Sequence, residues 1–145
     1  MKLLILNGPN LNLLGQRETE IYGTFTLEQL CTELSAYTRD TYPEIQLDFF
    51  QSNHEGELVE KLHAAPDTYS GIIFNPAAYT HYSIALRDAI AAIDVPVIEV
   101  HISNPDQRED FRKVNVIRDV CINHFQGKGI QSYKEAIDYL ESEVT

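Results

Sequence analysis

Apolar residues along this chain follow two alternating patterns, short continuous runs and longer stretches in which they recur every three or four positions. Short runs bounded by polar residues are typical of buried strands, and the longer spacing is typical of helices with one apolar face. The short runs predict strands over residues 2–6, 45–50, 71–74, 96–100 and 120–126. The longer stretches predict helices over residues 26–42, 55–64, 83–93 and 132–140.

Three of the predicted helices start at a residue whose side chain can accept a hydrogen bond from the first turn of the helix. Thr26 is followed by Glu28 and Gln29, Ser83 precedes the third helix, and Ser132 forms a capping box with Glu135. These residues predict where the helices begin.

Strands that alternate with helices imply right-handed crossovers and a parallel sheet covered by helices on both faces. For five strands the default arrangement is the flavodoxin-like order 2-1-3-4-5. No repeat, linker or low-complexity tract interrupts the 145 residues. We therefore expect a single α/β domain over residues 1–145, built as a three-layer sandwich.

Polar and reactive residues follow four of the predicted strands. The segments are NGPNLNLLGQRETEIYG (7–23), QSNHEG (51–56), NPAAYTH (75–81) and EVHISN (99–104). In sheets of this kind a ligand binds beyond the carboxyl ends of the strands, so these four segments predict the site. The first one is too polar and too rich in glycine for the core, and is long enough to close over a ligand.

The charge of the chain limits the partners that it can bind. Eleven Lys and Arg against 22 Asp and Glu give a formal net charge of −11. Nucleic acids and anionic membrane surfaces attract basic proteins, so we expect neither as a partner. An anionic small molecule remains compatible with this charge, provided that the few arginines gather in one pocket.

The chain shows no apolar stretch long enough for a membrane span. Its first predicted strand begins at residue 2, so no cleavable signal is visible and none is expected. Cys31 and Cys121 are far apart in the sequence and are the only cysteines, so two free thiols in a reducing compartment are the expectation. These features predict a cytoplasmic protein.

No motif for a metal or a cofactor is present. The five histidines are scattered, without the close spacing of a metal site. The loop after the first strand is neither GxGxxG nor GxxxxGK[ST] and lacks the Ser/Thr-rich cradle of a flavin site. Metal, nucleotide and flavin are therefore not expected.

Several short sequence motifs in the chain match one known family, in the same order and at the usual spacing. They are NGPNLNLLG (7–15), RE (17–18), YG (22–23), SNHEGEL (52–58), NP (75–76), AYTH (78–81), LRDA (86–89), EVHISN (99–104), RE (108–109) and FR (111–112). On these residues the chain resembles the type II 3-dehydroquinate dehydratases. The resemblance implies a cofactor-free lyase that converts 3-dehydroquinate to 3-dehydroshikimate in the shikimate pathway, as a homododecamer built from trimers.

By this resemblance Tyr22 is the catalytic base, Arg17 stabilises its charge, and His101 is the acid. Asn12 and Asn75 surround the reacting centre. The remaining residues that the resemblance implies to contact substrate are His81, Ile102, Ser103 and Arg112, together with Asp88, which reaches the site of a neighbouring subunit.

Four positions depart from the pattern of the family. The resemblance leads us to expect Gly at Ala77, Thr at Tyr82, Pro at Thr19 and Ser at Asn115. Because Ala77 and Tyr82 flank His81, we expect any difference to fall on substrate affinity or on subunit contacts. None of the residues with an implied chemical role is replaced.

The residues also support parts of this interpretation by themselves. Glu99 and His101 are two apart, so on a strand both side chains face the same way. A carboxylate beside a histidine suits a general acid, and the alternative is a structural pair at the end of the sheet. Arg108 and Arg112 are four apart and fit either a carboxylate clamp or a salt-bridged turn, and His81 fits either a helix cap or a donor to substrate.

A tyrosine can act as a base only with help, since a free phenol is ionised in about one molecule per thousand at neutral pH. An arginine about 4 Å away attracts the phenolate by on the order of 4 kcal/mol at an effective dielectric near 20. Arg17 lies five residues before Tyr22, close enough for this role. The alternative function is a non-catalytic flavodoxin-like module that binds an anionic metabolite or nucleotide, for which no matched base and acid are needed.

Overall fold

The computed structural model of the protein describes residues 1–144. Five parallel strands form one sheet in the order β2-β1-β3-β4-β5, which confirms the predicted flavodoxin-like order. The strands are β1 (Lys2–Asn7), β2 (Gln46–Gln51), β3 (Gly71–Asn75), β4 (Val97–His101) and β5 (Asn123–Gln126). The helices are α1 (Thr19–Tyr22), α2 (Leu27–Thr41), α3 (Glu55–Ala64), α4 (Ile84–Ala91) and α5 (Ile130–Val144).

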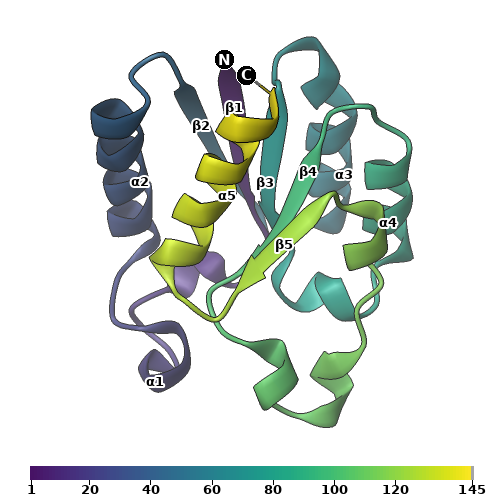
Figure 1. Ribbon diagram of the computed structural model, residues 1–145. Coiled ribbons are helices and arrows are strands. Elements are labelled where there is room, and N and C mark those ends of the chain that lie inside the picture. Colours follow the sequence, from purple (N-terminus) through teal and green to yellow (C-terminus); the bar gives the residue numbers. More distant parts are fainter. Residues whose placement is uncertain (145) are drawn as a thin grey trace.

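The sheet lies between two helical layers, each of which closes a separate apolar core (Figure 1). Side chains alternate between the faces of a strand, so Leu3 and Ile5 of β1 face α2 and α5, whereas Leu4 and Leu6 face α3 and α4. All four are fully buried. This explains why β1 appears in the sequence as a continuous apolar run, which is typical of a strand that is covered on both sides.

Two of the three predicted helix starts are confirmed. The Gln29 N–H donates to Thr26 Oγ1 at 3.1 Å, and the Thr26 N–H donates to Gln29 Oε1 at 2.9 Å, which completes a capping box. The Leu86 N–H donates to Ser83 Oγ at 3.0 Å at the start of α4.

The capping box predicted at Ser132 and Glu135 is wrong. Gly129, with a positive φ of 61°, turns the chain early, so that α5 begins at Ile130 and Ser132 lies inside the helix. There Ser132 Oγ accepts a hydrogen bond from the Lys128 N–H at 3.1 Å, and Glu135 pairs with the Lys128 ammonium at 2.9 Å.

The last strand is shorter than predicted and begins at Asn123 rather than at residue 120. Residues Arg118–Val120 form a 3-10 turn, in which the Cys121 N–H donates to the Arg118 carbonyl at 3.1 Å. Val120 and Cys121 are partly buried and pack against the core, so their apolar character reflects a turn against the core and not a strand.

The carboxyl ends of β1, β3 and β4 meet at one edge of the sheet. Asn7, the last residue of β1, is in register with Gln51 of β2 and with Asn75, the last residue of β3. His101 ends β4 opposite Gln126 of β5. The residues that follow these strands are therefore brought together, as the strand-end rule predicts.

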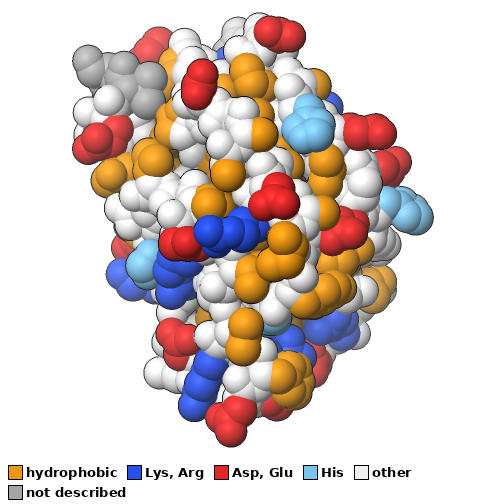
Figure 2. Space-filling model, turned by 90° about the vertical axis from the view of Figure 1, so that its right-hand side faces the viewer, with side chains coloured by type: hydrophobic (Ala, Val, Ile, Leu, Met, Phe, Trp, Pro, Cys, Tyr) orange, Lys and Arg blue, Asp and Glu red, His pale blue; other side chains and the backbone are white. Residues whose placement is uncertain are grey.

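The surface on the side of α4 carries apolar side chains beside charged ones (Figure 2). Tyr82 and Ile84 at the start of α4 are 62% and 54% exposed, and Phe111, Val114 and Ile122 are also exposed. Over residues 1–144, no helix combines the length and the apolar character that a membrane crossing requires.

Candidate active site

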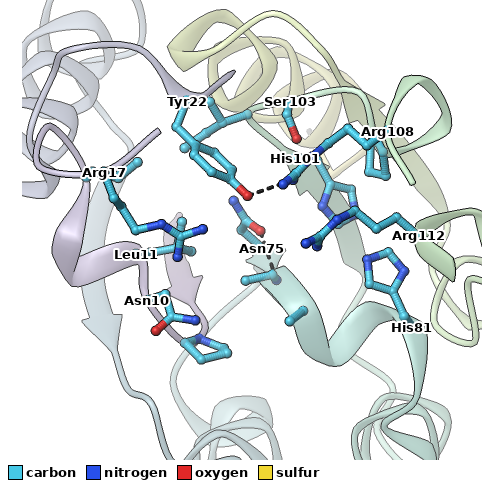
Figure 3. Close-up of a pocket in the computed structure, with 16 residues that line it drawn as sticks. Asn10, Leu11, Arg17, Tyr22, Asn75, His81, His101, Ser103, Arg108 and Arg112 are labelled. Atoms are coloured by element: carbon cyan, nitrogen blue, oxygen red, sulfur yellow. Dashed lines mark hydrogen bonds between the residues drawn. The ribbon is translucent and has the colours of Figure 1, made fainter. Parts of the chain in front are cut away.

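A cavity of about 130 Å³ opens at the carboxyl edge of β1, β3 and β4 (Figure 3). Its volume is close to the roughly 150 Å³ of an engineered cavity that binds benzene, so it suits a small molecule. The residues that line it include Asn10, Leu11, Arg17, Tyr22, Asn75, His81, His101, Ile102, Ser103, Arg108 and Arg112. We call residues 15–23 the lid segment, and Asn75, Glu99 and His101 the floor.

Asn75 enters the floor at the end of β3 and is 2% exposed. Its Oδ1 accepts a hydrogen bond from the Ala77 N–H at 3.0 Å, and its Nδ2 donates to the Tyr133 hydroxyl at 3.0 Å. Ala77 adopts a left-handed backbone with φ of 53°. This conformation explains why glycine is the expected residue there, since only glycine adopts it freely.

His101 and Glu99 form the other part of the floor. Glu99 lies two residues before His101 on β4, so both side chains point to the same face of the sheet. His101 Nε2 lies 2.6 Å from Glu99 Oε2, and because an ionised carboxylate only accepts, Nε2 is the donor. Asn115 Nδ2 donates to the same oxygen at 2.7 Å, and Arg118 Nε donates to Glu99 Oε1 at 2.8 Å. Asn115 thus keeps a structural role at a position where serine was expected.

Glu99 is fully buried, yet it stays ionised. Burial alone raises the pKa of this carboxyl group, but the hydrogen bonds and charges of His101 and Arg118 outweigh burial and lower the pKa to about 2. The floor therefore presents an imidazole whose Nε2 is hydrogen-bonded to a carboxylate that is ionised at neutral pH. The hydrogen bond to Glu99 fixes the orientation of the imidazole, which a general acid requires.

The lid segment carries Arg17 and Tyr22 over the cavity. Left-handed backbone conformations occur at Gly15, Glu18 and Gly23, with φ of 85°, 41° and 87°. The single turn of α1 lies between them and ends at Tyr22. These turns explain why the segment is long and rich in glycine, since it has to leave the sheet, cross the cavity and return.

Tyr22 is held between two guanidinium groups. Its hydroxyl oxygen accepts a hydrogen bond from Arg108 Nη1 at 2.6 Å, which Figure 3 shows crossing the cavity. The guanidinium carbons of Arg17 and Arg108 each lie 5.1 Å from the centre of the Tyr22 ring. Glu18 accepts from Arg17 Nη2 at 2.8 Å and lies 4.0 Å from Arg108 Nη2, so it tethers both arginines.

His81 and Arg112 line the cavity opposite the lid segment (Figure 3). His81 Nδ1 donates to the Val114 carbonyl at 2.7 Å. Burial lowers the pKa of His81, and the charges of His101, Arg112 and Arg108 add to this effect against the Val114 hydrogen bond. The neutral form of His81 is therefore favoured at neutral pH. Its second ring nitrogen, Nε2, takes no part in the bond to Val114. Arg112 lines the cavity and also pairs with Glu109. The two alternatives that the sequence left open, a carboxylate clamp and a salt-bridged turn, are therefore compatible.

The structure does not bring Asn12 to the cavity. Asn12 is exposed, and Asn10 lines the cavity instead. Leu11–Leu13 form a 3-10 turn with about three residues per turn, so residues two apart face different ways, and the buried Leu11 directs Asn12 outwards. The Asn10 N–H donates to Asn53 Oδ1 at 2.9 Å, which fixes the start of this turn.

Asp88 lies on the exposed side of α4 and does not line the cavity of its own chain. Two further departures from the expected pattern also lie outside the cavity. Thr19 is the first residue of α1. The Tyr82 ring packs edge-on against Tyr79, with ring centres 5.6 Å apart, and remains mostly exposed.

Arg108 has a larger role than its spacing from Arg112 indicates, because it contacts Tyr22. Its partner Tyr22 is 86 positions away, so no local spacing indicates the contact. The three cavity arginines, Arg17, Arg108 and Arg112, are among the chain's eleven basic residues. Three of the few arginines therefore gather in one pocket, as an anionic ligand requires, despite the overall negative charge of the chain. Over residues 1–144, no group of three or more His, Cys, Asp and Glu side chains is placed to hold a metal ion.

Comparisons with known proteins agree with this geometry. A sequence model of the family described as Dehydroquinase class II matches residues 1–141. The chain is 54% identical over 140 residues to the 3-dehydroquinate dehydratase of Bacillus pumilus (strain SAFR-032), which covers 97% of this chain and 94% of that protein. It is 49% identical over 140 residues to the protein of that name from Bacillus subtilis (strain 168), with coverage of 97% and 93%.

A likeness to solved structures points the same way. The crystal structure of type II dehydroquinase from Butyrivibrio crossotus DSM 2876 matches with a TM-score of 0.93 at 45% identity, and the match covers 97% of both chains. A 3-dehydroquinate dehydratase-like protein from Bifidobacterium longum matches with a TM-score of 0.74 at 31% identity. The chain belongs to the class II dehydroquinase family.

Proposed function

We propose that this chain dehydrates 3-dehydroquinate to 3-dehydroshikimate, a hydro-lyase reaction of the shikimate pathway, in the cavity at the carboxyl edge of the sheet. The observation that carries the proposal is that Tyr22, held between two arginines, shares one small cavity with His101 and its buried carboxylate partner. A reaction that removes a proton and then a hydroxyl group needs a base and an acid at separate places. The lid segment supplies the base and the floor supplies the acid.

The chemistry proceeds in two steps. The Tyr22 phenolate takes a proton from the carbon next to the substrate ketone, and the electron pair of that C–H bond forms an enolate. The ketone then re-forms as the neighbouring C–O bond breaks, and His101 gives its proton to the departing oxygen, which leaves as water. Substrate and side chains account for every proton and electron pair, so the scheme calls for no metal or cofactor.

Arg17 and Arg108 are the groups that make Tyr22 a base. Arg108 donates a hydrogen bond to the Tyr22 hydroxyl, and both guanidinium groups lie over the ring. A charge-assisted hydrogen bond is stronger to a phenolate than to a phenol, so we assign to these two arginines the stabilisation of the charge on the base. The role that the resemblance gave to Arg17 is thus shared by two arginines.

The enolate oxygen needs a donor that is already in place when charge develops. Asn75 fits this role because its carboxamide is fixed in the floor by two hydrogen bonds. For the second asparagine we replace Asn12 by Asn10, which lines the cavity. His81, Ile102, Ser103 and Arg112 line the remaining wall, and we assign them to binding the substrate, with Arg112 facing its carboxylate.

We further propose that the enzyme assembles as a homododecamer of trimers and that Asp88 completes the site of a neighbouring subunit. The exposed position of Asp88 on α4, the exposed Ile84 one turn earlier on the same helix and the exposed Tyr82 just before that helix support such a contact. Light scattering on the purified protein should give a particle twelve times the 16.5 kDa chain. A fully active monomer would remove both the assembly and the role of Asp88.

We also propose that the enzyme works in the cytoplasm as a single catalytic domain. Cys31 and Cys121 are free thiols, which suits a reducing compartment. The one sheet, with an apolar core on each face, joins strands from both ends of the chain, which supports the single domain.

The reaction itself is tested by mixing the purified protein with 3-dehydroquinate and following the ultraviolet absorbance of the conjugated enone product. We expect steady product formation that resists treatment with a metal chelator. If no product forms at high enzyme concentration while the substrate still binds in calorimetry, the chain is a non-catalytic binder and the proposal is wrong.

A further inference from the structure

Three buried polar side chains form a continuous chain of hydrogen bonds beneath the cavity. Asn75 Nδ2 donates to the Tyr133 hydroxyl at 3.0 Å, and the Tyr133 hydroxyl donates to Asn7 Oδ1 at 2.7 Å. Asn7, Asn75 and Tyr133 are 1%, 2% and 0% exposed. Tyr133 lies on α5 and does not line the cavity, so it is separated from the substrate by Asn75.

The directions of these hydrogen bonds follow from the chemistry of the groups. The Ala77 N–H can only donate, so the Asn75 atom 3.0 Å away must be the carbonyl oxygen. The amide nitrogen of Asn75 then faces Tyr133, whose hydroxyl has to accept. Burial raises the pKa of Tyr133, so the hydroxyl keeps its proton and donates it to Asn7. This arrangement gives the Tyr133 hydroxyl one donor and one acceptor as partners.

Two anchors on opposite sides therefore hold the Asn75 carboxamide, the Ala77 N–H on its oxygen and the Tyr133 hydroxyl on its nitrogen. An amide group has two N–H donors, and Tyr133 takes one of them. The other is left for the cavity, which Asn75 lines. Its direction is fixed because the first donor is fixed.

We infer that Tyr133 is a positioning residue for the dehydration, which aims the free N–H of Asn75 at the substrate by holding the opposite N–H from behind. The inference rests on the proposed function, because Asn75 matters only if the cavity carries out the reaction. Tyr133 is far from Asn75 in the sequence and contributes through its hydroxyl group, whereas its ring belongs to the apolar core.

The direct test is Tyr133→Phe, which removes the hydroxyl and keeps the ring. We expect kcat/KM to fall roughly 10-fold, as for the loss of one neutral hydrogen bond made to an active-site group. The same kinetic parameter, kcat or KM, should change as in Asn75→Ala. In the Asn75→Ala background the second substitution should have almost no further effect, because Tyr133 then has no carboxamide to hold.

The matched control is Tyr42→Phe, which also removes a hydroxyl that bonds across the α2 and α5 layer. The Tyr42 hydroxyl donates to Asp138 Oδ1 at 2.8 Å, and the Tyr37 hydroxyl donates to the same oxygen. Tyr42 and Asp138 do not line the cavity. This variant should lose thermal stability as Tyr133→Phe does, with kcat/KM unchanged.

A second measurement uses the unaltered protein, should Tyr133→Phe fail to fold. In ¹⁵N-labelled enzyme the Asn75 side-chain amide, assigned by its loss in Asn75→Ala, should show one proton that exchanges slowly with solvent and one that exchanges quickly. Equal, rapid exchange of both protons would overturn the inference.

The kinetic outcomes separate this inference from the proposed function. Wild-type protein that yields no product refutes the proposed function. If the wild type is active and the kcat/KM of Tyr133→Phe lies within about twofold of the wild-type value, the role of Tyr133 is refuted. The role of Tyr133 is also refuted if Tyr133→Phe lowers kcat/KM by the same factor in the wild-type and in the Asn75→Ala background. The hydroxyl would then act through the fold and not through the carboxamide.

Discussion

The floor and the lid segment border the same cavity from different sides, and they are held in place by different interactions. Asn75, Glu99 and His101 of the floor are at most 5% exposed, and each makes hydrogen bonds to other side chains or backbone beneath the cavity. The lid segment is partly exposed, includes left-handed residues and meets the rest of the site chiefly through Arg108.

This difference suits the two tasks in the proposed reaction. The acid has to stay in one orientation, which the hydrogen bond of His101 to the buried Glu99 carboxylate provides. The base has to come over the substrate and exclude water after binding, which a segment with few buried contacts can do. The comparison predicts that lid variants lose turnover while the fold stays intact, and that floor variants lose stability as well.

The largest effect is expected for Tyr22→Phe, which removes the base and leaves the ring between its two arginines. General base catalysis contributes about 10²–10⁴-fold, so we expect kcat to fall by that factor. Since the Tyr22 ring still packs against the core, the thermal unfolding midpoint should stay near that of wild type. Steady-state kinetics and calorimetry check both statements, and near-normal turnover would show that Tyr22 is not the base.

The next effect concerns the two arginines that contact Tyr22. A hydrogen bond to a charged group is worth about 1.5–3 kcal/mol, so Arg108→Ala should lower kcat by roughly 10- to 100-fold. Arg17→Ala should also lower kcat. If the positive charge of Arg17 is the cause, Arg17→Lys should lower kcat less than Arg17→Ala does.

The control for the arginine variants is Arg39→Ala, because Arg39 pairs with Asp40 on the exposed side of α2. This variant should keep full activity. If Arg108→Ala turned over like Arg39→Ala, the contact between Arg108 and Tyr22 would have no catalytic role.

The floor was easier to predict from the sequence than the lid segment. Glu99 and His101 lie two apart on a strand, so their pairing follows from strand geometry alone, and parallel strands bring Asn75 to the same edge. The contact of Tyr22 with Arg108 joins segments 86 residues apart, and no periodicity encodes it.

The errors share one physical cause. The resemblance implied Asn12 where the structure places Asn10 at the cavity, because the orientation of side chains in the 3-10 turn at Leu11–Leu13 is not visible in the sequence. The start of β5 and the capping box at Ser132 were misjudged for the same reason, since turns at Arg118–Val120 and at Gly129 decide both. Regular elements follow their periodicity, whereas short turns depend on the packing around them.

A moderate effect on stability is expected at Glu99 as the pH falls. Its pKa of about 2 lies below the ordinary value of 4.5 because His101 and Arg118 outweigh burial. The ionised group therefore stabilises the fold above pH 4.5, and this contribution is lost as the pH falls towards 2. About 2 kcal/mol should be lost between pH 6 and pH 3, as measured by urea unfolding.

Two variants test this assignment. Glu99→Gln should show a smaller loss of unfolding free energy over that pH range than wild type, by about that amount. Asp110→Asn, which removes an exposed partner of Lys113, should follow the wild-type curve. If Glu99→Gln and wild type lost the same stability, Glu99 would not be the group that titrates.

The smallest effect is expected at Ala77, where the floor departs from the expected glycine. Ala77→Gly removes the strain of a positive φ but increases the freedom of the unfolded chain, and these effects nearly cancel. The free energy of unfolding should change by less than about 1 kcal/mol, whereas Ala77→Val should destabilise by about 1–3 kcal/mol because branched residues resist this conformation. Equal stability of the valine and glycine variants would contradict the left-handed backbone.

The division of labour between lid segment and floor is tested most directly by proton exchange at the carbon next to the ketone of 3-dehydroquinate, followed by NMR in D₂O. With His101→Ala, we predict that deuterium enters at this carbon although little product forms, because Tyr22 still removes the proton and the acid is missing. With Tyr22→Phe, neither exchange nor product should appear. Deuterium entering at the wild-type rate with Tyr22→Phe would contradict the account, because the base would then lie elsewhere.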